Sequence, residues 1–223
     1  IPSPQKHEFK GEYRTPSALN FNLDSFEMDV NFISERLQEG LTITVNSENN
    51  LDNNLSVIQN NSLGREAYRL QISEDKIRIE ASHSTGVFYA FESLHQILLI
   101  AQNEEKGWPL LKIEDKPRFH NRGFMGDVAR NFYPKEKIFQ ILDYMALYKL
   151  NRFDLKLTDD DGWRIEIPGL PELTEVGSNR GYTTDENDRL IPMYGSGSGD
   201  QKSTGSGFLS GQDFVEILNY AKK

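Results

Sequence analysis

The stretch Leu150–Arg180, LNRFDLKLTDDDGWRIEIPGLPELTEVGSNR, decides the fold of the second half of the chain. Residues 153–158 alternate apolar and polar side chains, which predicts a β-strand with Phe153, Leu155 and Leu157 on one face. The acidic turn TDDDG, residues 158–162, follows this strand directly, and a Trp-Arg pair follows the turn.

The segments around this stretch alternate strand and helix. Residues 123–128 form an apolar strand, and Pro134 suits the start of a helix that extends to Tyr148 with apolar residues at helical spacing. Ser210 and Asp213 form a capping box for a last helix ending at Lys223. This alternation predicts an α/β fold with parallel strands and helices outside them.

The first hundred residues predict a small α+β domain. Residues 41–45 alternate as a strand, residues 67–72 and 76–81 form a hairpin around a polar turn, and the Asn-rich residues 46–61 favour turns. Ser84 and Thr85 are candidate caps for a helix over residues 86–102 that covers the sheet. Residues 106–118, with two prolines and a glycine, predict a hinge. We therefore expect domains at 1–117 and 118–223.

Composition limits the functional classes. The 223 residues carry a net charge of −9, which argues against a nucleic-acid partner. No apolar run approaches the roughly 20 residues of a membrane span. Cysteine is absent, which excludes disulfides and thiolate metal sites and leaves the compartment open. The chain begins with Ile1, which fits either a processed terminus after export or a chosen boundary.

The acidic turn has several interpretations. It lacks the spacing of a calcium-binding loop, and a solvated turn is one alternative. However, it follows a parallel strand, where α/β barrels place ligand-contacting residues. Trp163 alone indicates little, because an isolated tryptophan is more often part of a core. Arg122 is either a surface charge or a donor to vicinal hydroxyls. Asp127 and Arg130 are a candidate ion pair.

The remaining candidates favour structural roles. The glycine-rich loop over residues 181–207 lacks the endings of a phosphate loop or a dinucleotide fingerprint, so we expect a flexible loop at the rim of a site. The histidines do not cluster in sequence, and a structural role is the favoured interpretation for His7, His83, His95 and His120.

Several motifs together carry a family resemblance. RGFMGDVARNFYP, ILDYMALYKLNRF and LTDDDGWRIEIPGLPELTEVG resemble the start of the catalytic barrel of family 20 glycoside hydrolases, the β-N-acetylhexosaminidases, and the chitobiase branch most of all. The segment EAYRLQISEDKIRIEASHSTGVFYAFESLHQIL resembles the α+β domain that precedes that barrel. The resemblance implies a (β/α)₈ TIM barrel of which this chain holds about two β/α units, a truncated portion of a longer enzyme.

The resemblance also implies site residues and partners. Arg122, Trp163 and Arg164 match substrate-binding positions, and Asp159 with Asp160 matches the supporting acidic network. The implied substrate is an oligosaccharide or glycan ending in N-acetylhexosamine, with GlcNAc or GalNAc left open, and no cofactor or metal is implied. The implied reaction is retaining hydrolysis assisted by the substrate's own acetamido group. Export is the family habit, and the oligomeric state stays open.

Two departures bear on activity. The His-x-Gly-Gly-Asp-Glu motif that holds the family's acid/base pair does not occur in this sequence, so we expect the chain alone to be inactive. Asp154 and Lys156 stand where family members usually carry histidine. We expect both to lie inside the barrel and to pair with each other or with groups on neighbouring strands. A noncatalytic glycan-binding relative is the alternative function.

Overall fold

The computed structural model describes residues 3–14, 18–23, 25–47, 54–193, 196 and 205–222. They divide into two compact units, residues 1–120 and 121–223, which are described separately. Four strands of the first unit lie in segments for which the sequence predicted turns, a hinge or no element. The second unit follows the predicted alternation of strand and helix closely.

The first unit contains a five-stranded sheet in the order β1-β7-β5-β6-β4. The hairpin predicted at residues 67–81 is confirmed, because β5 (Tyr68–Ile72) pairs antiparallel with β6 (Ile77–Ala81). The edge strand β4 (Leu55–Gln59) pairs parallel with β6. It lies inside the Asn-rich segment for which the sequence predicted turns, so that prediction was wrong for these residues.

The predicted hinge was also wrong over most of its length. Residues 108–115 form β7 (Trp108–Asp115), which lies between β5 and β1 (Lys6–Arg14) and pairs antiparallel with both. Pro109 is tolerated because it lies near a β-bulge in β1, where the pairing shifts between Phe9 and Tyr13. Gly11, at φ 77° within this bulge, supplies a conformation that other residues rarely adopt.

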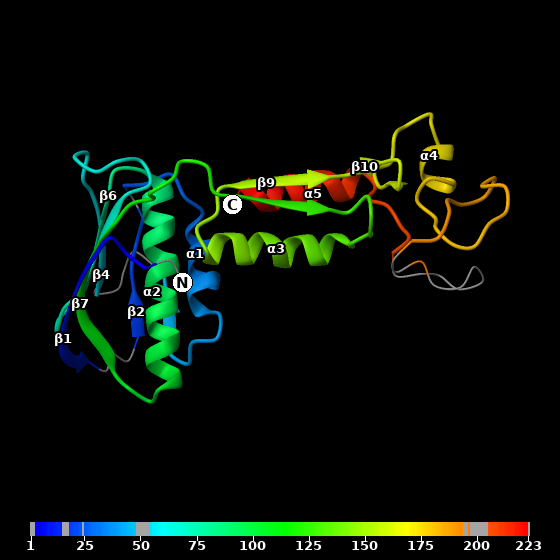
Figure 1. The fold of residues 1–223 in the computed structure, drawn as a ribbon. Helices are drawn as coiled ribbons and strands as arrows, with labels where there is room; N and C mark the ends of the chain where they lie inside the picture. The colour runs from blue at the N-terminus through cyan, green and yellow to red at the C-terminus, as the bar shows by residue number, and fades with distance from the viewer. Residues whose placement is uncertain are drawn as a thin grey trace. The chain divides into compact units, whose positions relative to one another are not determined.

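Helix α2 (Ser84–Asn103) covers one face of this sheet, as predicted (Figure 1). Its cap differs from the prediction, because the His83 side chain, and not Ser84 or Thr85, accepts a hydrogen bond from the backbone N–H of Thr85. The buried core joins apolar residues of the helix to those of β5 and β6: Val87, Phe91, Leu94, Leu98, Leu70, Ile72, Ile77 and Ile79. His95 is buried and bonds the Glu39 carbonyl at 2.7 Å, a structural role.

Helix α1 (Val30–Gln38) packs against α2 and was not predicted. Asp29 caps it by accepting hydrogen bonds from the N–H groups of Asn31 and Phe32. The short strands β2 (Ala18–Asn20) and β3 (Thr44–Asn46) pair in parallel beside it. The strand predicted at residues 41–45 is thus present only in part.

The second unit begins with two parallel strands, β8 (Gly123–Asp127) and β9 (Arg152–Lys156), joined through helix α3 (Lys135–Leu147). Two short strands, β10 (Thr158–Asp159) and β11 (Gly162–Trp163), form a small hairpin. Helices α4 (Glu172–Glu175) and α5 (Gly211–Lys222) follow. This is an α/β arrangement, and the described residues contain no closed barrel.

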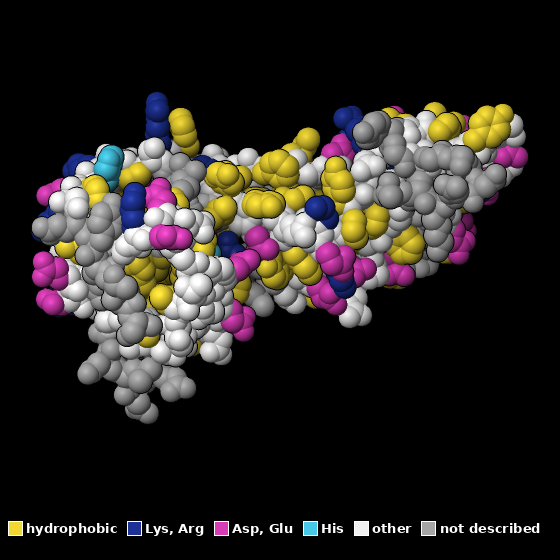
Figure 2. Space-filling view, turned by 90° about the horizontal axis from the view of Figure 1, so that it is seen from below, with side chains coloured by type: hydrophobic (Ala, Val, Ile, Leu, Met, Phe, Trp, Pro, Cys, Tyr) yellow, Lys and Arg dark blue, Asp and Glu magenta, His cyan; other side chains and the backbone are white. Residues whose placement is uncertain are grey.

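Helices α3 and α5 pack together along β8 and β9 (Figure 1). The predicted capping box is confirmed, because Ser210 and Asp213 exchange hydrogen bonds between side chain and backbone N–H. Lys135 of α3 contacts both Asp213 and Glu216 of α5 at 2.7 Å. Figure 2 shows hydrophobic side chains on the surface of this unit, and four large ones on the helices or at a helix end are exposed: Tyr144, Tyr148, Val215 and Leu218.

Replacement of Arg36 by methionine should lower the free energy of unfolding of the first unit by about 3 kcal/mol. The reason is that Arg36 of α1 pairs with Glu92 of α2, whose side chain is only 2% exposed, so the variant leaves a buried carboxylate without its cation. Urea unfolding followed by circular dichroism measures the change. The double variant Arg36→Met/Glu92→Leu should recover most of the loss, and a double variant no more stable than Arg36→Met would contradict this account.

Replacement of Asp213 by asparagine should cost stability at neutral pH and nothing near pH 2. The hydrogen bond from Lys135 lowers the pKa of Asp213 from 3.8 to about 2 in the folded chain. A lowered pKa stabilises the fold above pH 3.8, and this contribution is lost as the pH falls toward 2. Thermal midpoints of both proteins at several pH values measure the difference, and a gap that stays constant down to pH 2 would refute the linkage.

Candidate functional site

The site lies where β8 and β9 end. The two strands run parallel with Asp127 opposite Lys156, so their carboxyl ends carry charged residues side by side. On the other face, Phe153, Leu155 and Leu157 pack against a buried cluster that includes Ile138 of α3 and Ile217 of α5. The prediction that this apolar face meets the helices is confirmed. The opposite face is thereby left to the polar residues.

Five side chains form what we call the charged cluster: Asp127, Arg130, Lys156, Asp159 and Asp161. Arg130 Nε lies 3.6 Å from Asp127 Oδ2, 3.8 Å from Asp159 Oδ2 and 3.6 Å from Asp161 Oδ2. Lys156 Nζ lies 3.6 Å from Asp127 Oδ2 and donates a hydrogen bond to Asp159. The ion pair predicted between Asp127 and Arg130 is therefore present.

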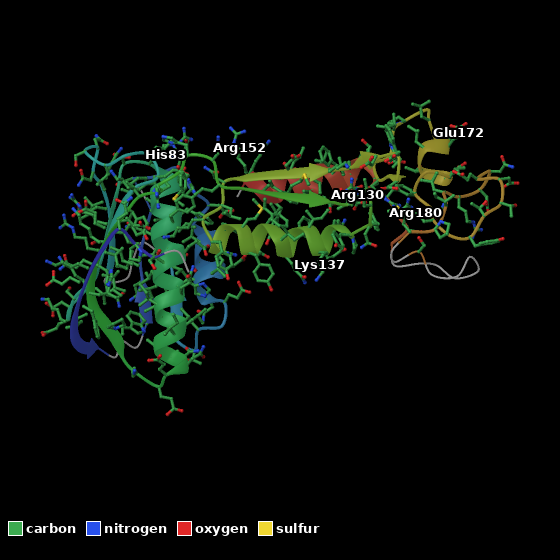
Figure 3. All side chains as sticks on the ribbon, viewed as in Figure 1. His83, Arg130, Lys137, Arg152, Glu172 and Arg180 are labelled. Atoms are coloured by element: carbon green, nitrogen blue, oxygen red, sulfur yellow. The ribbon has the colours of Figure 1, made fainter. Side chains whose placement is uncertain are left out.

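Arg130 is the exposed member of the cluster, with 62% of its side chain open to solvent. The three carboxylates are exposed by 18 to 26%. Asp127 also accepts a hydrogen bond at 3.1 Å from the backbone N–H of Arg130, which fixes the turn after β8. The arrangement presents one guanidinium to solvent above a base of carboxylates, and Figure 3 shows Arg130 near the ends of the two strands.

The pKa values of the two adjacent aspartates of the turn, Asp159 and Asp160, shift in opposite directions. A hydrogen bond with the Asp160 side chain, together with that from Lys156, holds the pKa of Asp159 well below its usual value. The same contact raises the pKa of Asp160, because a neighbouring carboxylate disfavours a second negative charge. The hydrogen bond to Asp159 raises the pKa of Lys156. Asp159 is therefore an anion and Lys156 a cation at neutral pH.

Arg164, predicted to bind substrate, is instead fully buried. Its Nε donates to the Ala129 carbonyl at 3.1 Å, and its Nη1 donates to the carbonyls of Ser178 and Gly207. Burial lowers its pKa to about 10, so it remains a cation at neutral pH. A guanidinium without exposed surface does not reach a sugar. We therefore assign Arg164 a structural role, because it connects the backbone segments around the site through the carbonyls it binds.

Glycine at position 162 is required by this packing. A Cβ there would lie 2.7 Å from the Ala129 carbonyl oxygen and 2.8 Å from Nη2 of Arg164. Trp163, the next residue, is partly buried and donates from Nε1 to the Ile165 carbonyl at 2.7 Å. Trp163 therefore lies near the cluster but is anchored within its own segment.

The structure does not bring Arg122 together with the cluster. Arg122 precedes β8 and so lies at the opposite end of the strand from Arg130. Its Nε donates to the Lys149 carbonyl at 2.7 Å, and its own carbonyl accepts from the N–H of Asn151. These bonds tie the start of β8 to the start of β9. Arg130, considered in the sequence only as an ion-pair partner, is the exposed arginine at the carboxyl end.

Asp154 is exposed on the two strands that the chain holds, and no described residue forms an ion pair with it. The pairing expected for Asp154 inside a closed barrel stays a prediction. Lys156 pairs with a group on the neighbouring strand, Asp127, as expected.

Carboxylate oxygens of Asp159, Asp160 and Asp161 lie within 4.8 Å of one another, close enough to share a cation. Protein cations already contact two of them. Lys156 binds Asp159, and Arg180, whose side chain is 2% exposed, donates from Nη2 to Asp161 at 3.2 Å. The acidic turn is thus neutralised largely by the chain's own residues.

Only part of the predicted glycine-rich loop falls within the described residues. Arg180 forms a bridge to Leu190, and Gly207 donates its N–H to the Ser178 carbonyl at 3.0 Å. Residues 194, 195 and 197–204 lie outside the described part of the chain. The ends of the loop are therefore fixed beside Arg164. In the described residues, no helix has both the length and the apolar character that crossing a membrane demands.

Models of two domains of one enzyme family match this chain. The model of the family's catalytic domain matches residues 119–223, and that of its domain 2 matches residues 1–116. The chain therefore belongs to glycosyl hydrolase family 20.

Several relatives agree with this assignment. N,N'-diacetylchitobiase of Vibrio harveyi is 52% identical over 70% of this chain and 17% of its own length. Beta-hexosaminidase B of Pseudoalteromonas piscicida is 37% identical over the whole chain and 28% of its own length. The structure of a GH20 exo β-N-acetylglucosaminidase from Vibrio harveyi in complex with N-acetylglucosamine matches the whole chain with a TM-score of 0.80 and 29% identity. The chain covers 34% of that protein.

Replacement of Arg164 by lysine should destabilise the second unit by about 2–4 kcal/mol, because buried carbonyls at Ala129, Ser178 and Gly207 lose donors. Thermal unfolding measures the loss. Arg189→Lys is the matched control, since Arg189 contacts the exposed Asp188. Equal thermal midpoints for the two variants would show that the buried guanidinium does not hold the site.

Proposed function

We propose that the whole protein is an exo-acting β-N-acetylhexosaminidase that removes terminal β-linked GlcNAc or GalNAc. The observation that carries the proposal is an exposed Arg130 above ionised carboxylates at the carboxyl ends of parallel strands, in a chain of family 20. The carboxyl ends are where (β/α)₈ barrels place their active sites. The relative from Vibrio harveyi solved with N-acetylglucosamine supports this sugar class.

Arg130 is the substrate-binding residue in this proposal. A guanidinium has five fixed donors, which suit the paired hydroxyls of a sugar ring. We prefer Arg130 to Arg122 because the Nε of Arg122 is already used by the Lys149 carbonyl at the far end of β8. Asp159 lies 3.8 Å from the guanidinium, and Asp160 is hydrogen-bonded to Asp159, in keeping with the network that the family resemblance implies.

The chemical step in this proposal is retaining hydrolysis in which the substrate's 2-acetamido oxygen attacks the anomeric carbon. The acid/base Asp-Glu pair that the resemblance implies has no counterpart in these 223 residues, so we propose that the chain alone does not hydrolyse glycosides. The (β/α)₈ barrel that begins with β8 and β9, and export from the cytoplasm, are parts of the same proposal.

A noncatalytic glycan-binding protein is the second candidate. The presence of Asp154 and Lys156 where the family usually carries histidine favours it, because the strand facing the site has changed its chemistry. The exposed Arg130 serves binding equally well in either case. The two functions differ only in turnover, so they are separated by one assay.

The natural-length gene product should release 4-nitrophenol from its β-GlcNAc glycoside, and the 223-residue chain should not. In the long form, Arg130→Ala should raise KM roughly tenfold to a hundredfold, the effect of losing charged hydrogen bonds to substrate. Arg152→Ala is the matched control, because Arg152 is exposed at the opposite end of β9 (Figure 3).

A well-folded long form without turnover that still binds GlcNAc in calorimetry would identify the glycan-binding relative. Turnover by the 223-residue chain would contradict the mechanism. An unchanged KM for Arg130→Ala would remove Arg130 from the substrate site.

A further inference from the structure

Lys156 connects the same carboxylates that surround Arg130. Its ammonium lies 3.6 Å from Asp127 Oδ2 and donates a hydrogen bond to Asp159, and both carboxylates also flank Arg130 Nε. The two cations therefore share the same neighbouring carboxylates. The ammonium is the partner that makes a hydrogen bond to Asp159, which places it closer than the guanidinium.

Arg130 is attracted by the carboxylates without being hydrogen-bonded to them. Its Nε lies 3.6 to 3.8 Å from three carboxylate oxygens, beyond the 2.7 to 3.2 Å of an N–H···O bond. No described residue accepts a hydrogen bond from its guanidinium. The donors of Arg130 thus stay available, although three anions lie within reach.

The contrast between the two cations has a chemical consequence. A carboxylate that already accepts from an ammonium offers less negative charge and fewer lone pairs to a second donor. Without the ammonium, Asp127 and Asp159 would gain most by bonding the guanidinium directly, in the bidentate way typical of Arg-carboxylate pairs. Arg130 would then point down into the cluster and away from solvent.

We propose that Lys156 is a positioning residue that keeps the Arg130 guanidinium presented to substrate, because it takes the hydrogen bond of Asp159 and partly neutralises Asp127 from 3.6 Å. The proposal rests on the proposed function of Arg130 in sugar binding. Stability alone is a poor reason for such a cluster, because partly exposed ion pairs contribute little to the free energy of unfolding. A substrate-facing role makes use of the exposure of Arg130.

The groups that face Lys156 determine how the test is designed. Asp127 comes from β8, Asp159 from β10 and Arg130 from the turn after β8, with Asp160 and Asp161 on the adjacent turn. Asp154 lies on the same face of Lys156's own strand. This predominantly anionic surrounding would raise the pKa of a histidine introduced at position 156 above its usual value of about 6.5.

The experiment uses the natural-length protein with 4-nitrophenyl β-GlcNAc and the variants Lys156→Met, Lys156→Arg and Lys156→His. Lys156→Met should raise KM roughly tenfold with a smaller change in kcat, because presented donors bind ground state and transition state alike. The KM of Lys156→Arg should stay close to the wild-type value. Lys137→Met is the control, since Lys137 is exposed on α3 and contacts Gln140.

The histidine variant tests the role of the charge at position 156 through the pH dependence of KM. If Lys156 were only structural, this pH dependence would not differ from that of the wild type. Its KM relative to wild type should be near one at about pH 5.5, where the imidazole is charged, and should rise toward that of Lys156→Met at about pH 8.5. A ratio that does not change with pH would overturn the proposal. So would a Lys156→Met variant with unchanged KM.

A crystal structure of Lys156→Met separates the failure of this inference from the failure of the proposed function. The expected result is an Arg130 guanidinium within hydrogen-bond distance of Asp127 or Asp159, whether or not the protein turns over substrate. An Arg130 side chain in its wild-type position would overturn the positioning role. Absence of turnover in the wild type, with Arg130 moved in the variant, would refute the enzyme and leave the positioning role intact.

Discussion

The buried guanidinium of Arg164 is the interaction on which the rest of the site depends. It binds carbonyl oxygens from three separate segments, at Ala129, Ser178 and Gly207, and it has no exposed surface. Ala129 directly precedes Arg130, and Arg164 itself follows the acidic turn. One side chain therefore fixes the distance between the turn after β8 and the turn after β9, where the charged cluster forms.

The cost of burying this cation explains the residues around it. Desolvation, together with the positive charge of nearby Arg180, lowers the pKa of Arg164 to about 10. Carbonyl dipoles compensate the charge of Arg164, and Asp161 compensates that of Arg180. The acidic turn thus serves both layers, because Asp161 contacts the buried Arg180 on one side and the exposed Arg130 on the other. Asp161 therefore contributes both to the buried structure and to the exposed charged cluster.

Local patterns in the sequence predicted the elements whose stability is local. The hairpin of β5 and β6, helix α2 and the parallel pair of β8 and β9 show their periodicity plainly. Strand β4 could not be predicted in this way, because the Asn, Ser and Asp residues around it favour turns and its pairing with β6 leaves no signal in its own sequence. Strand β7 was hidden by Pro109, whose tolerance depends on a bulge in β1, a strand nearly a hundred residues earlier.

The location of the site was predictable from the sequence, but the role of each arginine in it was not. The acidic turn after a strand indicated the correct edge of the sheet. Which arginine faces solvent depends on tertiary contacts, because Arg122, Arg130 and Arg164 are equally polar in sequence. The structure alone shows that Arg122 is tied to Lys149, Arg164 is enclosed and Arg130 is presented.

The anchoring of Ser178 and Gly207 to one guanidinium has a consequence for divergence within the family. The segment between them includes Arg180, which forms a bridge to Leu190 and contacts Asp161, so its first part belongs to the charged site. Both of its ends are held at fixed points, and its length can therefore change beyond Leu190 without moving the charged cluster.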